Sequence, residues 1–139
     1  MAHKIKGYGW LPDMPDGRDL LYSAPPKPLA ELPEKVDLRD DCPAVYNQGD
    51  LGSCTANAIG AALQYDQKKQ GEDDFTPSRL FIYYCERVIE HTVPSDSGAQ
   101  IRDGVKVSVK KGGPHESLWP YEIDKFAEKP PEKVYKDEI

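Results

Sequence analysis

The chain has 139 residues, of which 38% are hydrophobic, with 24 acidic and 18 basic side chains and a formal net charge of −6. This length favours one soluble globular unit, and no stretch approaches the ~20 consecutive apolar residues of a transmembrane helix, so we expect no membrane partner. The acidic balance leaves no basic stripe for a phosphate backbone, which argues against nucleic acid as a partner.

Residues 1–35 are rich in proline and are predicted to form an extended leader or pro-like arm rather than a helix. Within them, 11–22 combines turn-forming residues with a few apolar ones, so it could lie along a surface groove as a covering segment. A flexible leader is the alternative. No apolar run of the signal-peptide type follows the first basic residues, and we therefore expect a cytoplasmic protein.

The predicted globular body covers 36–125. It opens with 36–39, where apolar and polar residues alternate as in a short strand. A polar loop with two glycines follows at 47–53. The alanine-rich stretch 54–65 then favours a helix, with Cys54 at its N-terminus.

Two further helices are predicted in the second half of the body. Thr76 as N-cap, followed by a proline, predicts a helix that ends at about His91. Apolar residues at helical spacing predict another from Ile101, ended by Gly112 and the glycine and proline after it. The charged, proline-interrupted stretch 126–139 is predicted to be a peripheral tail.

The three cysteines are Cys42, Cys54 and Cys85, an odd number with no CxxC or Cys/His pair, so we expect no disulfide framework, no metal site and no cofactor. Cys54 is the candidate for chemistry. At the start of a helix, free N–H groups and the helix dipole favour the thiolate, which is the nucleophilic form of cysteine. An ordinary packing role is the alternative.

Gln48 precedes this cysteine by six residues, and the glycines between them let the chain turn sharply. The side-chain amide can therefore converge on the space beside the thiol. An amide donor together with the backbone N–H of Cys54 is the minimum apparatus for stabilising an oxyanion in acyl transfer.

These residues resemble a known family. The stretch 48–56 (QGDLGSCTA) is similar to the active-site segment of the papain-like cysteine peptidases. In the same order, 36–39 resembles the strand that opens their mature domain, 96–99 their glycine-containing substrate-binding segment, and 119–121 an aromatic-Pro-Tyr element. The arm at 7–22 resembles the leader of some bacterial and archaeal members.

The resemblance implies an α+β fold of two lobes, of which this chain supplies the mainly helical N-terminal lobe, while the β-rich second lobe is missing. It also implies a hydrolase that cleaves peptide bonds in a peptide or protein substrate through a thioester acyl-enzyme. The implied site residues are the catalytic Cys54 and Gln48 and the substrate-binding Gly52, Ser53, Ser97 and Gly98.

Departures from the family pattern qualify this expectation. Leu51 and Thr55 replace a cysteine and an aromatic residue of the signature, which excludes the usual disulfide from that first cysteine. The family's histidine and asparagine lie about 130–150 residues after the nucleophile, whereas 85 residues follow Cys54. His3, His91 and His115 all have plainer interpretations than that of a base.

We therefore expect this chain alone to be inactive and to need the missing C-terminal lobe as a partner. A half-fold should expose the apolar face meant for that lobe, which favours self-association. A non-catalytic module that binds extended peptides or a partner is the alternative function. A small helical scaffold with three structural thiols is a third interpretation.

Overall fold

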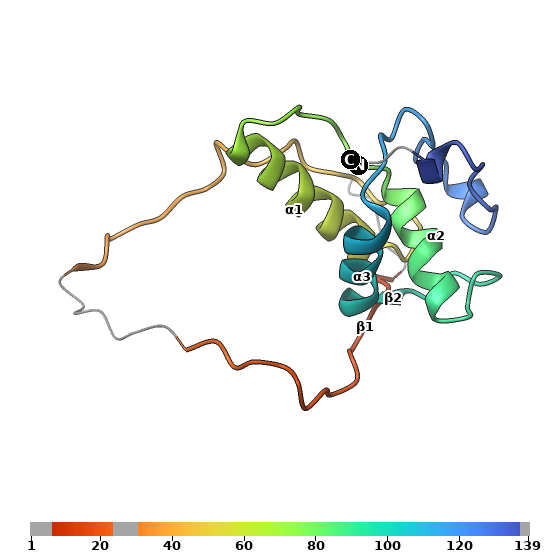
Figure 1. Cartoon of the computed structure of the whole chain (residues 1–139), viewed down its shortest axis with the longest axis horizontal. Helices are drawn as coiled ribbons and strands as arrows, with labels where there is room; N and C mark the ends of the chain where they lie inside the picture. The colour runs from red at the N-terminus through yellow and green to blue at the C-terminus, as the bar shows by residue number, and fades with distance from the viewer. Residues whose placement is uncertain (1–6, 24–30, 137–139) are drawn as a thin grey trace.

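The computed structural model describes residues 7–23 and 31–136. Its body is a bundle of three helices in mutual contact (Figure 1): α1 (Cys54–Gln70), α2 (Arg79–Ile89) and α3 (Ile101–Lys111). Two short strands, β1 (Trp10–Leu11) and β2 (Ala99–Gln100), pair in parallel, and 3-10 turns occur at Ile123–Lys125 and Val134–Lys136. Across the described ranges, no helix is both long and apolar enough to cross a membrane.

Helix α1 begins at Cys54, as predicted, and continues past the expected end at 65 to Gln70. Lysines in its last turn interact favourably with the negative end of the helix dipole. Gly71 then ends the helix with φ 74°, in the left-handed region that favours glycine. The first residue of this helix is therefore the predicted nucleophile.

Helix α2 is capped by Ser78 and not by the predicted Thr76. The Ser78 hydroxyl accepts the N–H of Phe81 at 3.3 Å. Thr76 and Pro77 are instead held against a later segment, where the N–H of Glu116 donates to the carbonyl of Thr76 at 2.9 Å. A long-range backbone contact at Thr76 and Pro77 thus moves the first residue of the helix to Arg79, two positions after the proline.

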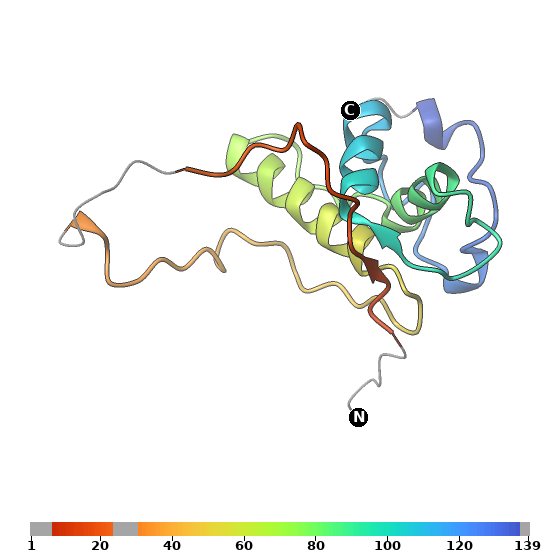
Figure 2. The same cartoon turned by 90° about the horizontal axis from the view of Figure 1, so that it is seen from below.

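Helix α3 has the predicted bounds. It begins at Ile101 and ends before Gly112, whose φ of 69° closes the helix as expected for a C-terminal glycine. The two-residue strand β2 runs directly into its start. Because β2 also pairs with β1, the beginning of α3 lies beside the N-terminal arm, as Figure 2 shows.

The apolar core has two parts on opposite sides of α2. One contains Leu51, Ile59, Leu80, Ile82 and Tyr83, and the other contains Phe81, Tyr84, Cys85, Val107 and Val134. The stretch from 126 to 136, predicted to be a peripheral tail, is mostly exposed but has contacts with the second part of the core. Val134 is buried, and the ring of Tyr135 meets that of Phe81 edge-on with centroids 5.0 Å apart.

The predicted strand at 36–39 does not form. Val36 and Leu38 are exposed, and Arg39 pairs with Asp37 next to it. A strand needs a neighbouring edge, and no described strand lies beside this segment.

Candidate active site

Cys54 lies directly beside the N-terminal arm of the chain. The thiol is half-buried, and the backbone N–H of Cys54 donates to the carbonyl of Tyr8 at 3.2 Å. The preceding Ser53 is the N-cap of α1 but makes no capping hydrogen bond with its side chain. The backbone N–H of Cys54, which has no partner within the helix, therefore donates to a carbonyl of the residues just before β1.

Gln48 points its amide toward the same peptide. Its Nε2 donates to the carbonyl of Leu51 at 2.9 Å and lies 3.5 Å from that of Gly7. Gly49, with φ 61°, provides the turn after it. The structure thus brings Gln48 and Cys54 together around two consecutive carbonyls of the arm, those of residues 7 and 8.

The arm passes between two glycines. A Cβ placed on Gly9 would lie 1.7 Å from the carbonyl oxygen of Gly52, and one placed on Gly98 would lie 2.1 Å from that of Gly9. The N–H of Ala99 donates to the carbonyl of Gly9 at 2.8 Å. These contacts place the predicted residues Gly52 and Gly98 on opposite walls of a groove wide enough only for backbone.

The two predicted serines lie at the same place but face differently. Ser53 is fully buried, and its hydroxyl bridges the phenol of Tyr121 at 2.5 Å and the amide of Asn57 at 3.0 Å. The Ser97 hydroxyl donates to the carbonyl of Gly98 at 3.2 Å. Both side chains are thus engaged within the lobe, and substrate binding by these residues stays a prediction that concerns their backbone.

The loop that carries Gln48 is anchored from the far end of the described chain. The Tyr121 hydroxyl donates to the carbonyl of Gln48 at 3.0 Å. Arg79 lies between the rings of Tyr46 and Tyr121, 4.5 and 4.2 Å from their centroids, and its guanidinium donates twice to Glu116 at 2.8 Å. An ion pair and two stacked rings therefore hold the loop in place.

The opposite walls of the groove are joined by Tyr83 and Asp96. The Asp96 carboxylate accepts the N–H of Gly52 at 3.0 Å and the hydroxyl of Tyr83 at 2.5 Å. The same hydroxyl accepts the N–H of Gly98 at 3.1 Å. Burial and the neighbouring carboxylate strongly raise the pKa of Tyr83, so it stays a neutral donor that ties the two glycine walls together.

Arg87 fixes the loop that carries Asp96. Its side chain is fully buried, and its guanidinium donates to the carbonyls of Val93 at 2.7 Å, of Ser95 at 3.1 Å and of Phe126. Burial lowers the pKa of this guanidinium from its ordinary value. The sequence pattern gives no sign of this role, because the partners of an arginine on the apolar face of a helix are set only by the three-dimensional fold.

The electrostatics of Cys54 differ from the expectation for a helix start. Burial raises the pKa of the thiol and outweighs the N–H of Thr55, which favours the thiolate, while the carboxylate of Glu86 raises the pKa further. No imidazole is among the groups that act on the thiol in the described part of the chain. In this structure, the helix terminus alone does not activate Cys54.

Comparison with known proteins identifies the lobe. No family model matches the chain. It is 39% identical to an uncharacterized peptidase C1-like protein of Acanthamoeba polyphaga mimivirus over 149 aligned positions, which cover 95% of the chain and 48% of that relative. It is similar to the crystal structure of xylellain, a cysteine protease from Xylella fastidiosa, with a TM-score of 0.85, 44% identity and coverage of 99% of this chain and 56% of the other.

By both comparisons the chain is a relative of the papain-like cysteine peptidases. The resemblance seen in the sequence is thereby confirmed, and so is the fold class, a mainly helical papain-like lobe. The chain spans about half the length of the curated relative that it matches.

The histidines of this papain-like lobe have structural surroundings of their own. The ring of His115 stacks on that of Phe75 with centroids 3.8 Å apart. His91 follows the end of α2, where it adopts φ 59°, and His3 lies outside the described residues. Within residues 7–23 and 31–136, no group of three or more possible metal ligands occurs.

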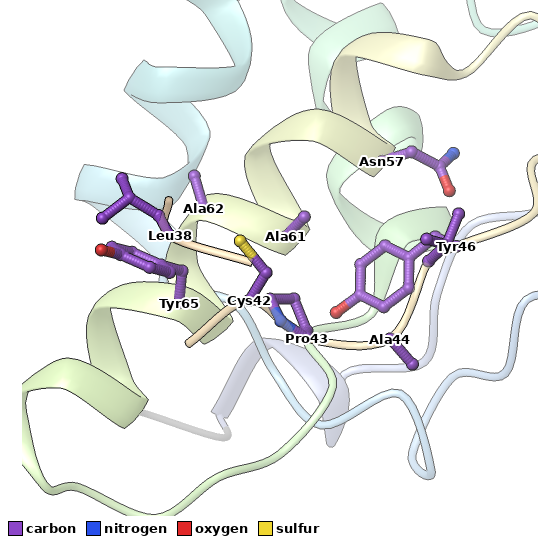
Figure 3. Close-up of a pocket in the computed structure, with 10 residues that line it drawn as sticks. Leu38, Cys42, Pro43, Ala44, Tyr46, Asn57, Ala61, Ala62 and Tyr65 are labelled. Atoms are coloured by element: carbon purple, nitrogen blue, oxygen red, sulfur yellow. The ribbon is translucent and has the colours of Figure 1, made fainter. Parts of the chain in front are cut away.

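An apolar groove of about 510 Å³ lies along the outer face of α1 in the papain-like lobe (Figure 3). Ala61 and Tyr65 form its helical side, and Leu38, Cys42 and Tyr46 line the side formed by the incoming chain. Cys42 and the adjoining apolar segment are exposed. The groove therefore borders the site but contains neither Cys54 nor Gln48.

Proposed function

We propose that this chain is the nucleophile-bearing lobe of a cysteine peptidase that cleaves peptide bonds through a thioester acyl-enzyme. One observation carries the proposal. The N–H of Cys54 and the amide of Gln48 both face carbonyls of one extended peptide, those of Tyr8 and Gly7. The two donors that an oxyanion needs thus face two consecutive carbonyls of the arm, one donor to each.

The reaction begins when a base takes the proton of the Cys54 thiol and the thiolate attacks a peptide carbonyl carbon. The resulting oxyanion accepts a hydrogen bond from the N–H of Cys54. It accepts a second one from the side-chain amide of Gln48, once that amide leaves the carbonyl of Leu51. The C–N bond breaks as the protonated base returns its proton to the leaving amine. Water then hydrolyses the thioester and releases the acyl group as a carboxylic acid.

The base is assigned to a segment outside this chain, the missing C-terminal lobe of the proposal. The raised pKa of Cys54 supports this assignment, because a thiol without a basic partner is a poor nucleophile at neutral pH. The apolar groove along α1, with the exposed Leu38 and Val45 beside it, is the surface proposed for that lobe. The same surface accounts for the proposed self-association of the isolated chain.

Peptide substrates are proposed to bind in the groove that the arm now fills. Gly52 and Gly98 leave room for an extended backbone, and the N–H of Ala99 offers the hydrogen bond that it now gives to Gly9. The arm is therefore proposed to compete with substrate. Its carbonyl at Tyr8 occupies the position that a scissile carbonyl would need.

The test measures two properties of Cys54, alkylation against pH and hydrolysis of a peptide library, with and without the downstream segment of the gene. Alone, the chain should alkylate slowly at neutral pH and hydrolyse nothing. With the second segment, both reactions should accelerate. Cys54→Ala should abolish hydrolysis, whereas the matched Cys42→Ala should not. Hydrolysis by the 139-residue chain alone would contradict the proposal.

A non-catalytic peptide-binding module is the second candidate, and the raised pKa of Cys54 together with a filled groove favours it. In that case Cys54→Ala should keep the affinity for a peptide that copies 7–12, measured by calorimetry on a chain lacking 1–22. Absence of hydrolysis even with the downstream segment would then select this candidate.

A further inference from the structure

Glu86 is a fully buried carboxylic acid next to the nucleophile's helix turn, and the proposed mechanism gives it no role. It belongs to α2, and its Oε2 accepts the hydroxyl of Thr55 at 2.9 Å. Thr55 is the residue directly after Cys54. The other carboxyl oxygen, Oε1, has no hydrogen-bond partner in the described structure.

All three helices close around this carboxyl group. A Cβ added to Gly104 of α3 would lie 2.2 Å from Glu86 Oε1 and 2.2 Å from Cδ1 of Ile59 in α1. The absence of a side chain at 104 is thus what allows the acid to reach the start of α1. A buried polar group costs stability unless it is hydrogen-bonded, and Oε1 of Glu86 is packed against α1 and α3 without such a partner in the described structure.

The charged groups around Glu86 come from each element packed against it. Asp103 of α3 and Glu90 on its own helix add negative charge, while Arg87 adds positive charge, and Asp103 is paired with Lys106 at 2.7 Å. Burial is the largest influence and raises the pKa of Glu86 to about 8. Below that pH, the side chain is a neutral acid.

We propose that Glu86 is a positioning residue for Cys54, which holds the first turn of α1 through Thr55 and whose ionisation opposes that of the thiol. The inference rests on the proposed function for the role of the thiolate. The direct hydrogen bond to Thr55 and the close packing of the carboxyl group between three helices carry it.

Two states follow from this arrangement. While Glu86 is protonated, burial is the main influence that raises the pKa of the Cys54 thiol. Once Glu86 becomes a carboxylate, its charge raises the pKa of Cys54, so the two protons are coupled. Coupled sites of this kind leave the thiolate population rising less steeply with pH than a single site would.

The first experiment follows alkylation of Cys54 by iodoacetamide from pH 6 to 10, read by peptide mass spectrometry in the full 139-residue chain. Glu86→Gln keeps an acceptor for Thr55 and removes the charge. Its alkylation rate at pH 8.5 should rise about threefold, with the profile moved to lower pH. The matched Glu72→Gln, at an exposed position after α1, should alkylate as the parent chain does.

A second measurement needs no variant. Carbon-13 NMR of the parent chain should show one glutamate carboxyl that titrates near pH 8, assigned to Glu86. Titration of every glutamate between pH 4 and 5, or a Glu86→Gln profile identical to the parent's, would overturn the inference. Neither measurement needs turnover, so a chain that never hydrolyses peptides can still show the coupling, and failure of the proposed function is separable from failure of this one.

Discussion

The walls of the groove and the segment that fills it are held by different kinds of contact. On the wall side, Tyr83, Arg87 and Tyr121 make partly buried side-chain hydrogen bonds to loops outside their own elements. On the arm side, the chain touches the lobe through a few backbone contacts at 8–10 and through exposed ion pairs, with Leu20 almost fully exposed. The site is therefore built independently of the peptide that occupies it.

The largest effect is expected from Arg87→Met. The substitution keeps the volume but leaves the carbonyls of Val93 and Ser95 without donors, which should lower the free energy of unfolding by about 3 kcal/mol. Urea denaturation followed by circular dichroism measures it. The matched Arg18→Met, on the exposed arm, should leave the midpoint unchanged, and equal losses in the two variants would erase the distinction between wall and arm.

Tyr83→Phe tests the link between the two glycine walls. Removal of the hydroxyl takes a donor from Asp96 and an acceptor from the N–H of Gly98, at a cost of about 2 kcal/mol. Hydrogen exchange should accelerate at the amides of Gly52 and Gly98 beyond the change in global stability. Acceleration equal to that of distant amides would assign Tyr83 to general packing.

Gly9→Val attacks the arm instead of the walls. Its side chain would overlap the carbonyl of Gly52, so the arm should leave the groove while the helices stay as stable as before. Alkylation of Cys54 should then become several-fold faster, and the amide of Ala99 should lose protection. The control is Gly17→Val, since nothing lies within 4 Å of that position. Unchanged alkylation in Gly9→Val would mean that the arm does not limit access.

The smallest effect concerns the ion pair between Asp19 and Arg102, whose atoms are 2.8 Å apart. The hydrogen bond from Arg102 lowers the pKa of Asp19. Its contribution to holding the arm is therefore present above about pH 4, the unfolded value, and is lost as pH falls through the lower folded value. The amide shift of Ala99 should move slightly over that range, and Asp19→Asn should remove the movement.

The local features of the fold were predictable. The alanines after Cys54 and the terminal glycine of α3 set helix positions by propensity and capping, which depend on neighbours in sequence. Proximity of Gln48 to Cys54 also followed from a short glycine-containing loop. A strand at 36–39 did not form, because alternation supplies a strand's side chains but not the edge it needs.

The network behind the site was not predictable by the same means. Glu86 and Arg87 are consecutive charged residues, and a sequence pattern treats such a pair as a solvated end of a helix. Their burial depends on Gly104, on the loop that contains Val93 and on Phe126. The raised pKa of Cys54 was likewise not predictable, because the burial of the thiol is set by the packing of three helices and not by its position at a helix terminus.

The hydrogen bond from Tyr121 to the carbonyl of Gln48 can form only late in synthesis, because residue 121 is made well after residue 48. Proteins leave the ribosome N-terminus first, so the arm exists before α1, and α1 before the tyrosine that fixes the loop beside it. Tyr8 is thus already available when the donors of Gln48 and Cys54 reach their final places. The carbonyl of Tyr8 is therefore on the chain before the donors that face it have been made.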